Sequence, residues 1–205
     1  LRCLVGSEMC IRDRNEIVKT HTKTSKFIHW TFSLLYAYGI FKQVEELDQL
    51  NNPSILMVEI VFAGIFLGIV FIRYFYMKDV DTLLGAKVEI PKGHLFIAKT
   101  IHRLVYLTLI LLPTTGLIIA ALFAYSLPGI NFAVAIHEFS AFLSYALIGI
   151  HIVASIYSRL KGEGVWDAMV PIWKEKEKID SEILSNLETI ENKVYKKTEE
   201  IFKIK

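Results

Sequence analysis

Residues 135–153 read AIHEFSAFLSYALIGIHIV, an apolar run that contains two histidines and one glutamate. His137 and His151 are 14 residues apart. Fourteen residues of α-helix rise about 21 Å and make almost four turns, so both imidazoles face nearly the same side of a helix long enough to cross a bilayer. The small residues Ala141 and Ser144 lie on the stripe between them. This stripe leaves room for a flat ligand against the helix.

The two histidines admit two interpretations. A lone histidine on an apolar helix is usually a hydrogen-bonded core residue. Ionisable side chains at membrane depth are costly, however, and are usually functional. The alternative hypothesis is therefore that the two imidazoles bind haem iron. The sequence of this one helix supports both interpretations about equally.

The composition of the whole chain is that of a membrane protein. Of its 205 residues, 53% are hydrophobic, and the mean hydropathy is +0.42, which is too apolar for an ordinary soluble domain. A net charge of only +2 gives no reason to expect a nucleic-acid partner. Cys3 and Cys10 are the only cysteines, and their spacing matches no metal or redox motif. No C-x-x-C-H sequence is present, which excludes covalent c-type haem attachment.

Four apolar segments predict an all-α membrane protein built on a four-transmembrane-helix bundle. The spans are expected at about residues 24–41, 54–76, 101–125 and 132–158, within a membrane domain of residues 15–173. Residues 1–14 start with leucine and contain no apolar leader, so we expect a non-native or fragment segment there.

Positive charges orient the four predicted spans. Lys and Arg residues gather before the first span, between the second and third, and after the fourth, whereas the other two connections hold only Lys42. By the positive-inside rule, both termini are cytoplasmic. His29 and His151 then share the inner depth of the membrane, and His137 lies near the outer side together with Glu59.

The last segment, residues 174–205, is charged and carries an apolar stripe at heptad-like spacing. The stripe consists of Ile183, Leu187, Ile190, Val194 and Ile201. It is too short for a firm coiled-coil assignment. We expect a soluble amphipathic helix on the cytoplasmic side, with docking of a soluble partner and self-association as the alternatives.

Three motifs resemble those of a known family. They are Ile28-His29-Trp30 at the start of the first span, Pro113-Thr114-Thr115-Gly116 eleven residues after His102, and His137-Glu138 followed by Gly149-Ile150-His151. With these motifs the chain resembles the bacterial cytochrome b561 family over about residues 19–173. More broadly, it resembles the b-type cytochrome subunits of membrane hydrogenases and formate dehydrogenases.

The resemblance implies a bundle with two haem b groups stacked across the bilayer. His29 and His151 would hold the inner haem, and His137 with a histidine of the second span would hold the outer one. At that second-span position, 14 residues before Arg73, this chain has Glu59 instead. We therefore expect one haem b per chain and a buried polar pair between Glu59 and His137. The alternatives are an outer haem with Glu59 as a weak ligand, or a ligand from a partner subunit.

Several basic residues near the inner side of the membrane have open roles. Arg73, Arg103 and Lys99 are candidates for haem propionate contacts, but the positive-inside rule alone also explains them. His102 is a candidate for a propionate or quinone contact, and capping of the third span is its alternative.

The implied function is electron transfer. Two neutral imidazoles saturate haem iron, which favours electron transfer over oxygen chemistry. The resemblance therefore implies an electron-transfer cytochrome of the bacterial inner membrane, of the oxidoreductase class if it is an enzyme. It would contact lipid, form oligomers in some members, and work in a respiratory chain between a quinone pool and a donor or acceptor protein or small molecule. The alternative is a non-redox scaffold or assembly protein. Glu59 favours that alternative, whereas the retention of His29 and His151 argues against it.

Overall fold

The computed structural model describes residues 21–78, 83, 85–176 and 178–204. This part of the chain consists of helices and connecting segments and contains no β-strand. The predicted fragment segment, residues 1–14, and both cysteines lie outside the described residues.

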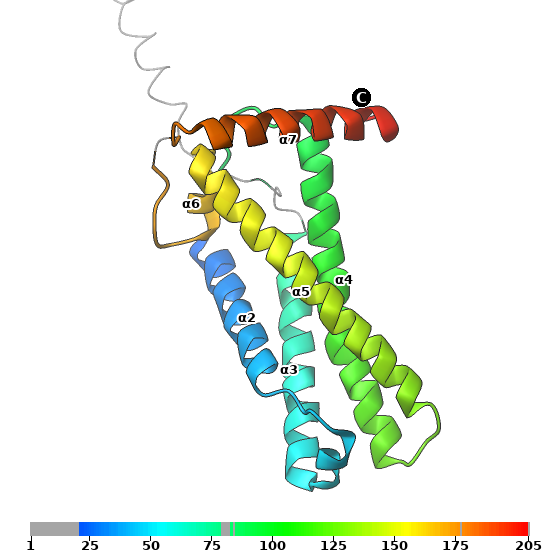
Figure 1. Ribbon diagram of the computed structural model, residues 1–205. Helices are drawn as coiled ribbons and strands as arrows, with labels where there is room; N and C mark the ends of the chain where they lie inside the picture. The colour runs from blue at the N-terminus through cyan, green and yellow to red at the C-terminus, as the bar shows by residue number, and fades with distance from the viewer. Residues whose placement is uncertain (1–20, 79–82, 84, 177, 205) are drawn as a thin grey trace, which may run out of the picture.

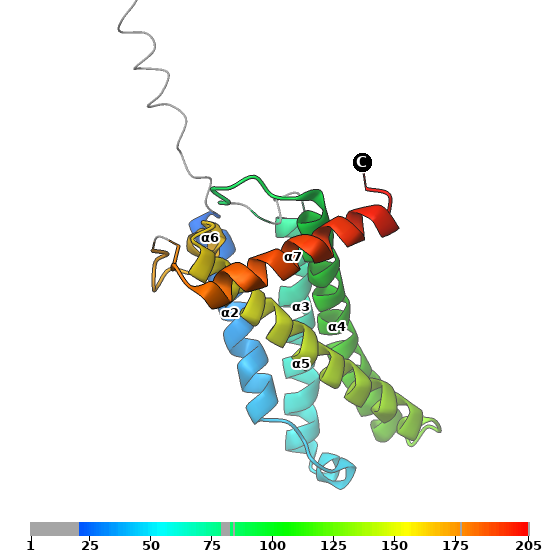
Figure 2. The ribbon, with the colours of Figure 1, turned by 45° about the horizontal axis from the view of Figure 1, so that its top comes forward.

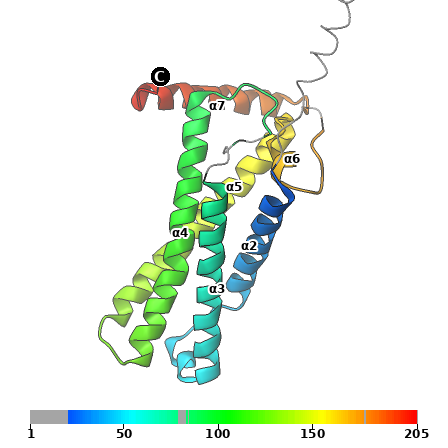
Figure 3. The same cartoon turned by 180° about the vertical axis from the view of Figure 1, so that it is seen from behind.

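Four long helices run antiparallel along one another (Figure 1). They are α2 (Lys23–Phe41), α3 (Pro53–Met77), α4 (Lys92–Ala124) and α5 (Ile130–Lys161). The described residues also form three shorter elements: the 3-10 helix η1 (Leu47–Asn51), and the helices α6 (Val165–Met169) and α7 (Glu182–Ile201). The starts of α2 and α4 and the ends of α3 and α5 lie at one end of the molecule, together with α6 and α7 (Figures 1 and 3).

Local sequence signals set the limits of the long helices. The Thr22 hydroxyl accepts the backbone N–H of Ser25 at 3.1 Å and caps α2. Asn52 caps α3, and Pro53 occupies its first turn, where a missing N–H costs nothing. Gly129 and Gly162 flank α5 with φ values of 99° and 69°, which glycine adopts without strain.

The third helix is longer than the predicted span of residues 101–125. It begins at Lys92, directly after Pro91, and it continues through Pro113. In the additional turns Lys92, His94 and Lys99 flank the apolar residues 95–98, so the uncharged run does not extend to them, and they pack against α7. The backbone N–H of Gly93 donates to Glu199 Oε1 of α7 at 2.6 Å. A side chain at Gly93 would overlap the Tyr195 backbone oxygen, so only glycine permits this close approach.

The core is divided along the length of the bundle, with α4 packed against both α3 and α5. Phe32, Phe66, Val70 and Leu109 form one buried cluster where α2, α3 and α4 meet. A second cluster of Leu50, Ile119 and Ala133 lies at the other end, beside η1.

Three described helices, α3, α4 and α5, are long and apolar enough to cross a membrane. Many apolar side chains of α3 and α5 are exposed, which is expected where lipid surrounds the protein, whereas α4 is the most buried of the three. The predicted first span corresponds to α2, which does not reach the same apolarity. Its 19 residues include Lys23 and Lys26 in the first turn.

Helix α7 lies across the end of the bundle, nearly at right angles to the long helices (Figures 1 and 2). It does not stand free of the bundle, because the side of α7 that carries Glu191 and Tyr195 packs against α4 and α5. Lys161 Nζ donates to both carboxylate oxygens of Glu191, at 2.9 and 2.8 Å. The His94 ring of α4 stacks on Tyr195 with ring centroids 4.8 Å apart. The predicted apolar stripe of residues 183–201 is exposed.

Candidate functional site

A cluster of basic side chains lies inside the bundle near the α7 end. Each long helix contributes one member: His29 from α2, Arg73 from α3, His102 from α4 and His151 from α5. His21, which precedes α2, is the fifth member. The rings of His102 and His151 meet edge to face with centroids 5.2 Å apart. Residues that are far apart in the sequence therefore meet at one level of the molecule.

Several nitrogen atoms of this cluster are buried without a hydrogen-bond partner among the described residues. They are Nδ1 of His21, His29 and His102, and Nη1 of Arg73. A buried polar group left unpaired costs about 1–3 kcal/mol, so such a set is usually completed by a ligand or water. A haem fits this donor set, because its iron binds imidazole nitrogen and its propionates accept hydrogen bonds from arginine.

The start of α2, which carries His29, is tied to α6. Lys26 Nζ donates to the Asp167 carbonyl oxygen at 3.2 Å, and the Trp30 indole donates to the Met169 carbonyl oxygen at 3.4 Å. The Trp30 ring also meets the His29 ring edge to face, with centroids 5.8 Å apart. These contacts fix the depth and orientation at which α2 presents His29.

Not every predicted inner residue joins the cluster. Arg103 is exposed on α4, although its neighbour His102 faces the bundle. His21 was missed by sequence reasoning, since it lies outside any helix period, yet its side chain is buried. Among the described residues, no group of three or more His, Cys, Asp or Glu side chains is arranged to hold a bare metal ion.

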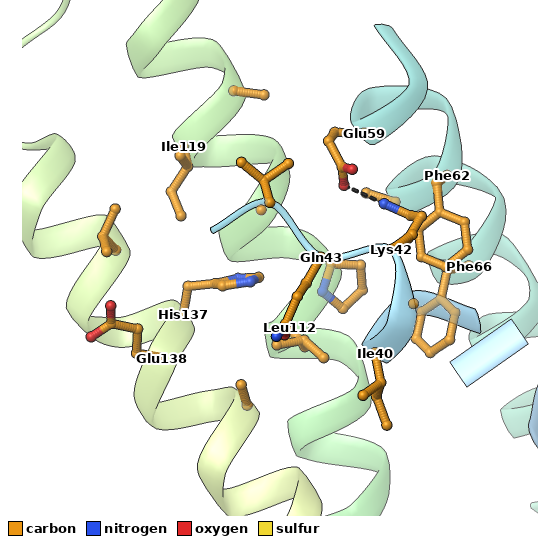
Figure 4. Close-up of a pocket in the computed structure, with 18 of the residues that line it drawn as sticks. Ile40, Lys42, Gln43, Glu59, Phe62, Phe66, Leu112, Ile119, His137 and Glu138 are labelled. Atoms are coloured by element: carbon orange, nitrogen blue, oxygen red, sulfur yellow. Dashed lines mark hydrogen bonds and ion pairs between the residues drawn. The ribbon is translucent and has the colours of Figure 1, made fainter. Parts of the chain in front are cut away.

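The other predicted site, at the opposite end of the bundle, is a cavity of about 340 Å³. It lies between the connection that follows α2 and the helices α3, α4 and α5 (Figure 4). His137 of α5 points into it, and the exposed Glu138 lies at its edge. Gly116 of α4 lies beside this imidazole, and an added side-chain carbon there would be in ordinary van der Waals contact with His137 Cε1, at 3.5 Å. The term "outer cavity" is used below for this space.

A hydrogen bond from α4 holds the His137 ring. The Thr115 hydroxyl lies 2.8 Å from His137 Nδ1, 2.8 Å from the Leu111 carbonyl oxygen and 3.0 Å from that of Leu112. The single hydroxyl proton can be donated either to a carbonyl oxygen or to Nδ1, so both neutral tautomers of His137 satisfy this contact.

Glu59 lines the opposite side of the outer cavity and pairs with Lys42, not with His137. Lys42 Nζ donates to Glu59 Oε2 at 2.5 Å and lies 4.3 Å from the centroid of the Phe62 ring. The expected Glu59–His137 pair is therefore wrong. Its physical reason is that Lys42, directly after α2, brings a full positive charge within reach of the carboxylate, whereas a neutral imidazole offers only a dipole. One imidazole and one neutralised carboxylate do not fit a haem that needs two nitrogen ligands.

Comparison with known proteins adds one finding. A family model described as prokaryotic cytochrome b561 matches residues 20–171, which include α2 to α6, the basic cluster and the outer cavity. Searches of the curated proteins and of the solved structures found no match.

Proposed function

The chain belongs to the prokaryotic cytochrome b561 family, and on this premise we propose that it carries electrons across part of the bacterial inner membrane through a single bis-histidine haem b. Membership of the family supports a membrane b-type cytochrome in electron transfer. The number of haems, the ligands and the redox partners belong to the proposal.

The basic cluster is the observation that carries this proposal. Four helices each direct one basic side chain to the same level, and several of the nitrogen atoms there are buried without partners. His29 and His151 would be the axial ligands, since they come from α2 and α5. A bound haem would supply a one-electron couple whose potential depends on its axial ligands, hydrogen bonds and burial.

The remaining cluster residues would orient the group and balance its charge. Arg73 would donate to a propionate, because its Nη1 has no partner among the described residues. His102 meets His151 edge to face. It would therefore pack against that axial ring or contact a propionate. The packing of α6 on Lys26 and Trp30 would keep His29 in place.

The proposed topology has four spans, with the α7 end of the molecule in the cytoplasm. Lys and Arg residues are concentrated at this end, in the segments that flank α2, α3, α4 and α5, whereas the opposite end carries Lys42. The membrane domain would be residues 15–173, and residues 174–205 would form a cytoplasmic tail. Electrons would pass between a quinone pool and a protein or small-molecule partner in a respiratory chain.

A second candidate function is a non-redox membrane scaffold. The Lys42–Glu59 ion pair favours it, since a neutralised carboxylate stands where the family resemblance places a haem ligand. The basic cluster argues against it. Four of its buried nitrogens have no hydrogen-bond partner among the described residues, which lowers stability, and a scaffold has no ligand to offset that cost.

An absorption spectrum separates the two functions. The protein purified from membranes should show a reduced-minus-oxidised b-type band, and haem extraction should give about one haem per chain. A protein that binds no haem after expression in haem-replete cells would contradict the electron-transfer proposal and favour the scaffold.

A further inference from the structure

We propose that α7 lies in the headgroup layer of the membrane, with the apolar stripe of residues 183–201 in contact with lipid. The occupant of this unpartnered side of α7 is the lipid surface around the bundle, and not a soluble protein or a second copy of the chain. The inference goes beyond electron transfer and does not depend on haem. It rests on the proposed topology only for the side of the membrane, which would be the cytoplasmic one.

The orientation of α7 is that of a helix lying on a membrane surface. Helices α3, α4 and α5 are long and apolar enough to cross a bilayer, and α7 runs nearly at right angles to them at one end of the bundle (Figures 1 and 2). A helix perpendicular to the spans is parallel to the membrane plane. The 20 residues of α7 can therefore keep one side at a constant depth over about 30 Å.

Contacts with the last turns of α5 place α7 at the edge of the bilayer. Residues 139–158 of α5 contain no Asp, Glu, Lys or Arg, and Arg159 and Lys161 follow directly. Tyr157, inside this uncharged run, donates to Glu191 Oε2 of α7 at 3.0 Å, and Lys161, just beyond it, donates to the same oxygen at 2.8 Å. Helix α7 is thus docked where the uncharged run ends, which is the headgroup level of a membrane span.

The apolar stripe points sideways from the bundle. Leu184, Glu191 and Tyr195 define the side of α7 that faces the bundle, since Leu184 is buried and the other two contact α5 and α4. At about 100° per residue, the stripe lies roughly a quarter turn around the helix from that side. It therefore runs along the membrane plane at the headgroup level. Its two ends, Ile183 and Ile201, are 73% and 63% exposed, and an exposed aliphatic row of this kind marks an interaction surface.

The charges of α7 favour lipid as the occupant. Three of its five acids are engaged by the protein, because Glu188 and Glu191 form ion pairs and Glu199 accepts the backbone N–H of Gly93. Its three lysines form no ion pair among the described residues: Lys193, Lys196 and Lys197. An aliphatic row beside free lysines is typical of helices in the membrane interface, where lysine meets anionic headgroups.

The stripe itself argues against a second copy of the chain. Lys197 stands at the heptad position between Val194 and Ile201, where an apolar residue would continue the stripe. Two copies packed stripe to stripe would bury this ammonium group. On a lipid surface, the same side chain can extend its apolar stem along the stripe and place its charge among the headgroups.

Site-directed spin labelling of the full chain tests this proposal in nanodiscs of phosphatidylcholine and phosphatidylglycerol. In a Cys3→Ser, Cys10→Ser background, nitroxide labels are attached through Ile190→Cys on the stripe and through Thr189→Cys, its exposed neighbour on the polar side. Phe142→Cys, exposed on α5, is the lipid reference. Oxygen concentrates in lipid and a nickel chelate stays in water. The ratio of oxygen to nickel collision rates should be severalfold higher at residue 190 than at residue 189, and close to that of the reference.

Equal ratios at residues 189 and 190 would overturn the proposal, because the stripe would then face water. Spin–spin broadening at residue 190 that disappears on dilution with unlabelled chain would also overturn it, because a second copy would then cover the stripe. Val194→Cys and Lys196→Cys repeat the comparison one turn further along, should a label disturb α7. The measurement requires no haem, so its outcome is independent of the absorption spectrum that tests electron transfer.

Discussion

His29 and His151 are the residues whose replacement should have the largest spectroscopic effect. His29→Ala and His151→Ala should each abolish the low-spin bis-imidazole spectrum, because one imidazole alone leaves an iron coordination position open. Low-temperature electron paramagnetic resonance of the oxidised protein measures this loss directly.

The chain offers a matched control for these two variants. His94 also lies in the α7 half of the molecule, but its ring stacks on Tyr195 outside the basic cluster. His94→Ala should keep the low-spin signal. Retention of that signal in both His29→Ala and His151→Ala would contradict the assignment and point to His102 as a ligand.

Replacement of Glu59 by histidine tests whether a second haem site can be created. Glu59→His would place a second imidazole opposite His137 in the outer cavity and release Lys42 from its ion pair. We expect the haem content, measured by pyridine haemochrome analysis against protein mass, to rise from about one to about two haems per chain. Asp48→His is the control, because Asp48 is an exposed acid of η1 outside the lining of the cavity. An unchanged ratio of one in Glu59→His would show that the cavity does not accept a haem even with both nitrogens.

Single residues show where sequence reasoning succeeded and where it stopped. The 14-residue spacing and the charge pattern placed His151 and His29 at one level, and both join the basic cluster. The prediction that His137 is the partner of Glu59 was wrong. Lys42 reaches Glu59 only because of how the chain turns after α2, which the sequence does not show. His102 and Arg103 were both predicted at the inner site, although adjacent residues on a helix point about 100° apart, and only His102 faces the bundle.

At the scale of elements, the contact between α4 and α7 depends on one glycine. Gly93→Val should displace α7, because its side chain would overlap the Tyr195 backbone, and overpacking of this kind costs about 1–3 kcal/mol. Limited proteolysis should then cut within residues 182–201 faster, while haem content stays unchanged. Gly64→Ala is the matched control, since nothing lies within 4 Å of the added carbon there. Equal cleavage rates in the two variants would show that α7 is not held by this contact.

The docking of α7 should also depend on pH through Glu191. Burial alone would raise the pKa of Glu191, but hydrogen bonds from Lys161 and Tyr195 and the charge of Lys161 lower it below its ordinary value. A lowered carboxyl pKa stabilises the docked form above the ordinary value of about 4.3, and this contribution is lost as the pH falls through the lower pKa. The hydrogen-exchange protection factors of α7, which are corrected for the intrinsic pH dependence of exchange, should therefore stay high at pH 5 and fall below about pH 4. Glu191→Gln should remove this acid step, and an unchanged step in that variant would contradict the assignment.

The positions of the helices along the chain were predictable where an apolar run marks the whole helix. Apolar runs located α3 and α5 to within a few residues. They missed the first turns of α4, because Lys92, His94 and Lys99 interrupt the apolar run there and the contact with α7 is not visible in the local sequence. The orientation of α7 was not predictable either. Its acidic side faces Lys161 and its apolar stripe is exposed, an arrangement set by charge partners that are distant in the sequence.

At the scale of the whole molecule, the number of spans determines where the two ends of the chain lie. Hydropathy identifies α3, α4 and α5, and three spans would place the termini on opposite sides of the membrane. Helix α2, however, packs along α3 in the same layer as the other long helices. Phe32 lies against Phe66 with ring centroids 5.0 Å apart, and Tyr38 lies against Phe62 at 5.6 Å. Since α3 is long and apolar enough to cross a membrane, a helix in contact with it over this length would share its depth, and we therefore expect four spans.

This argument gives a prediction that two reporters test together. A cytoplasmic reporter such as a fluorescent protein should be active when fused at either terminus, because four spans return the chain to the side on which it started. Alkaline phosphatase inserted after Gly129, in the connection between α4 and α5, should be active, because that connection lies at the opposite end of the bundle and carries no Lys or Arg. Phosphatase activity at one terminus alone would mean that α2 does not cross the membrane. His29 would then lie outside the bilayer, and the haem ligand on α2 would have to be reassigned.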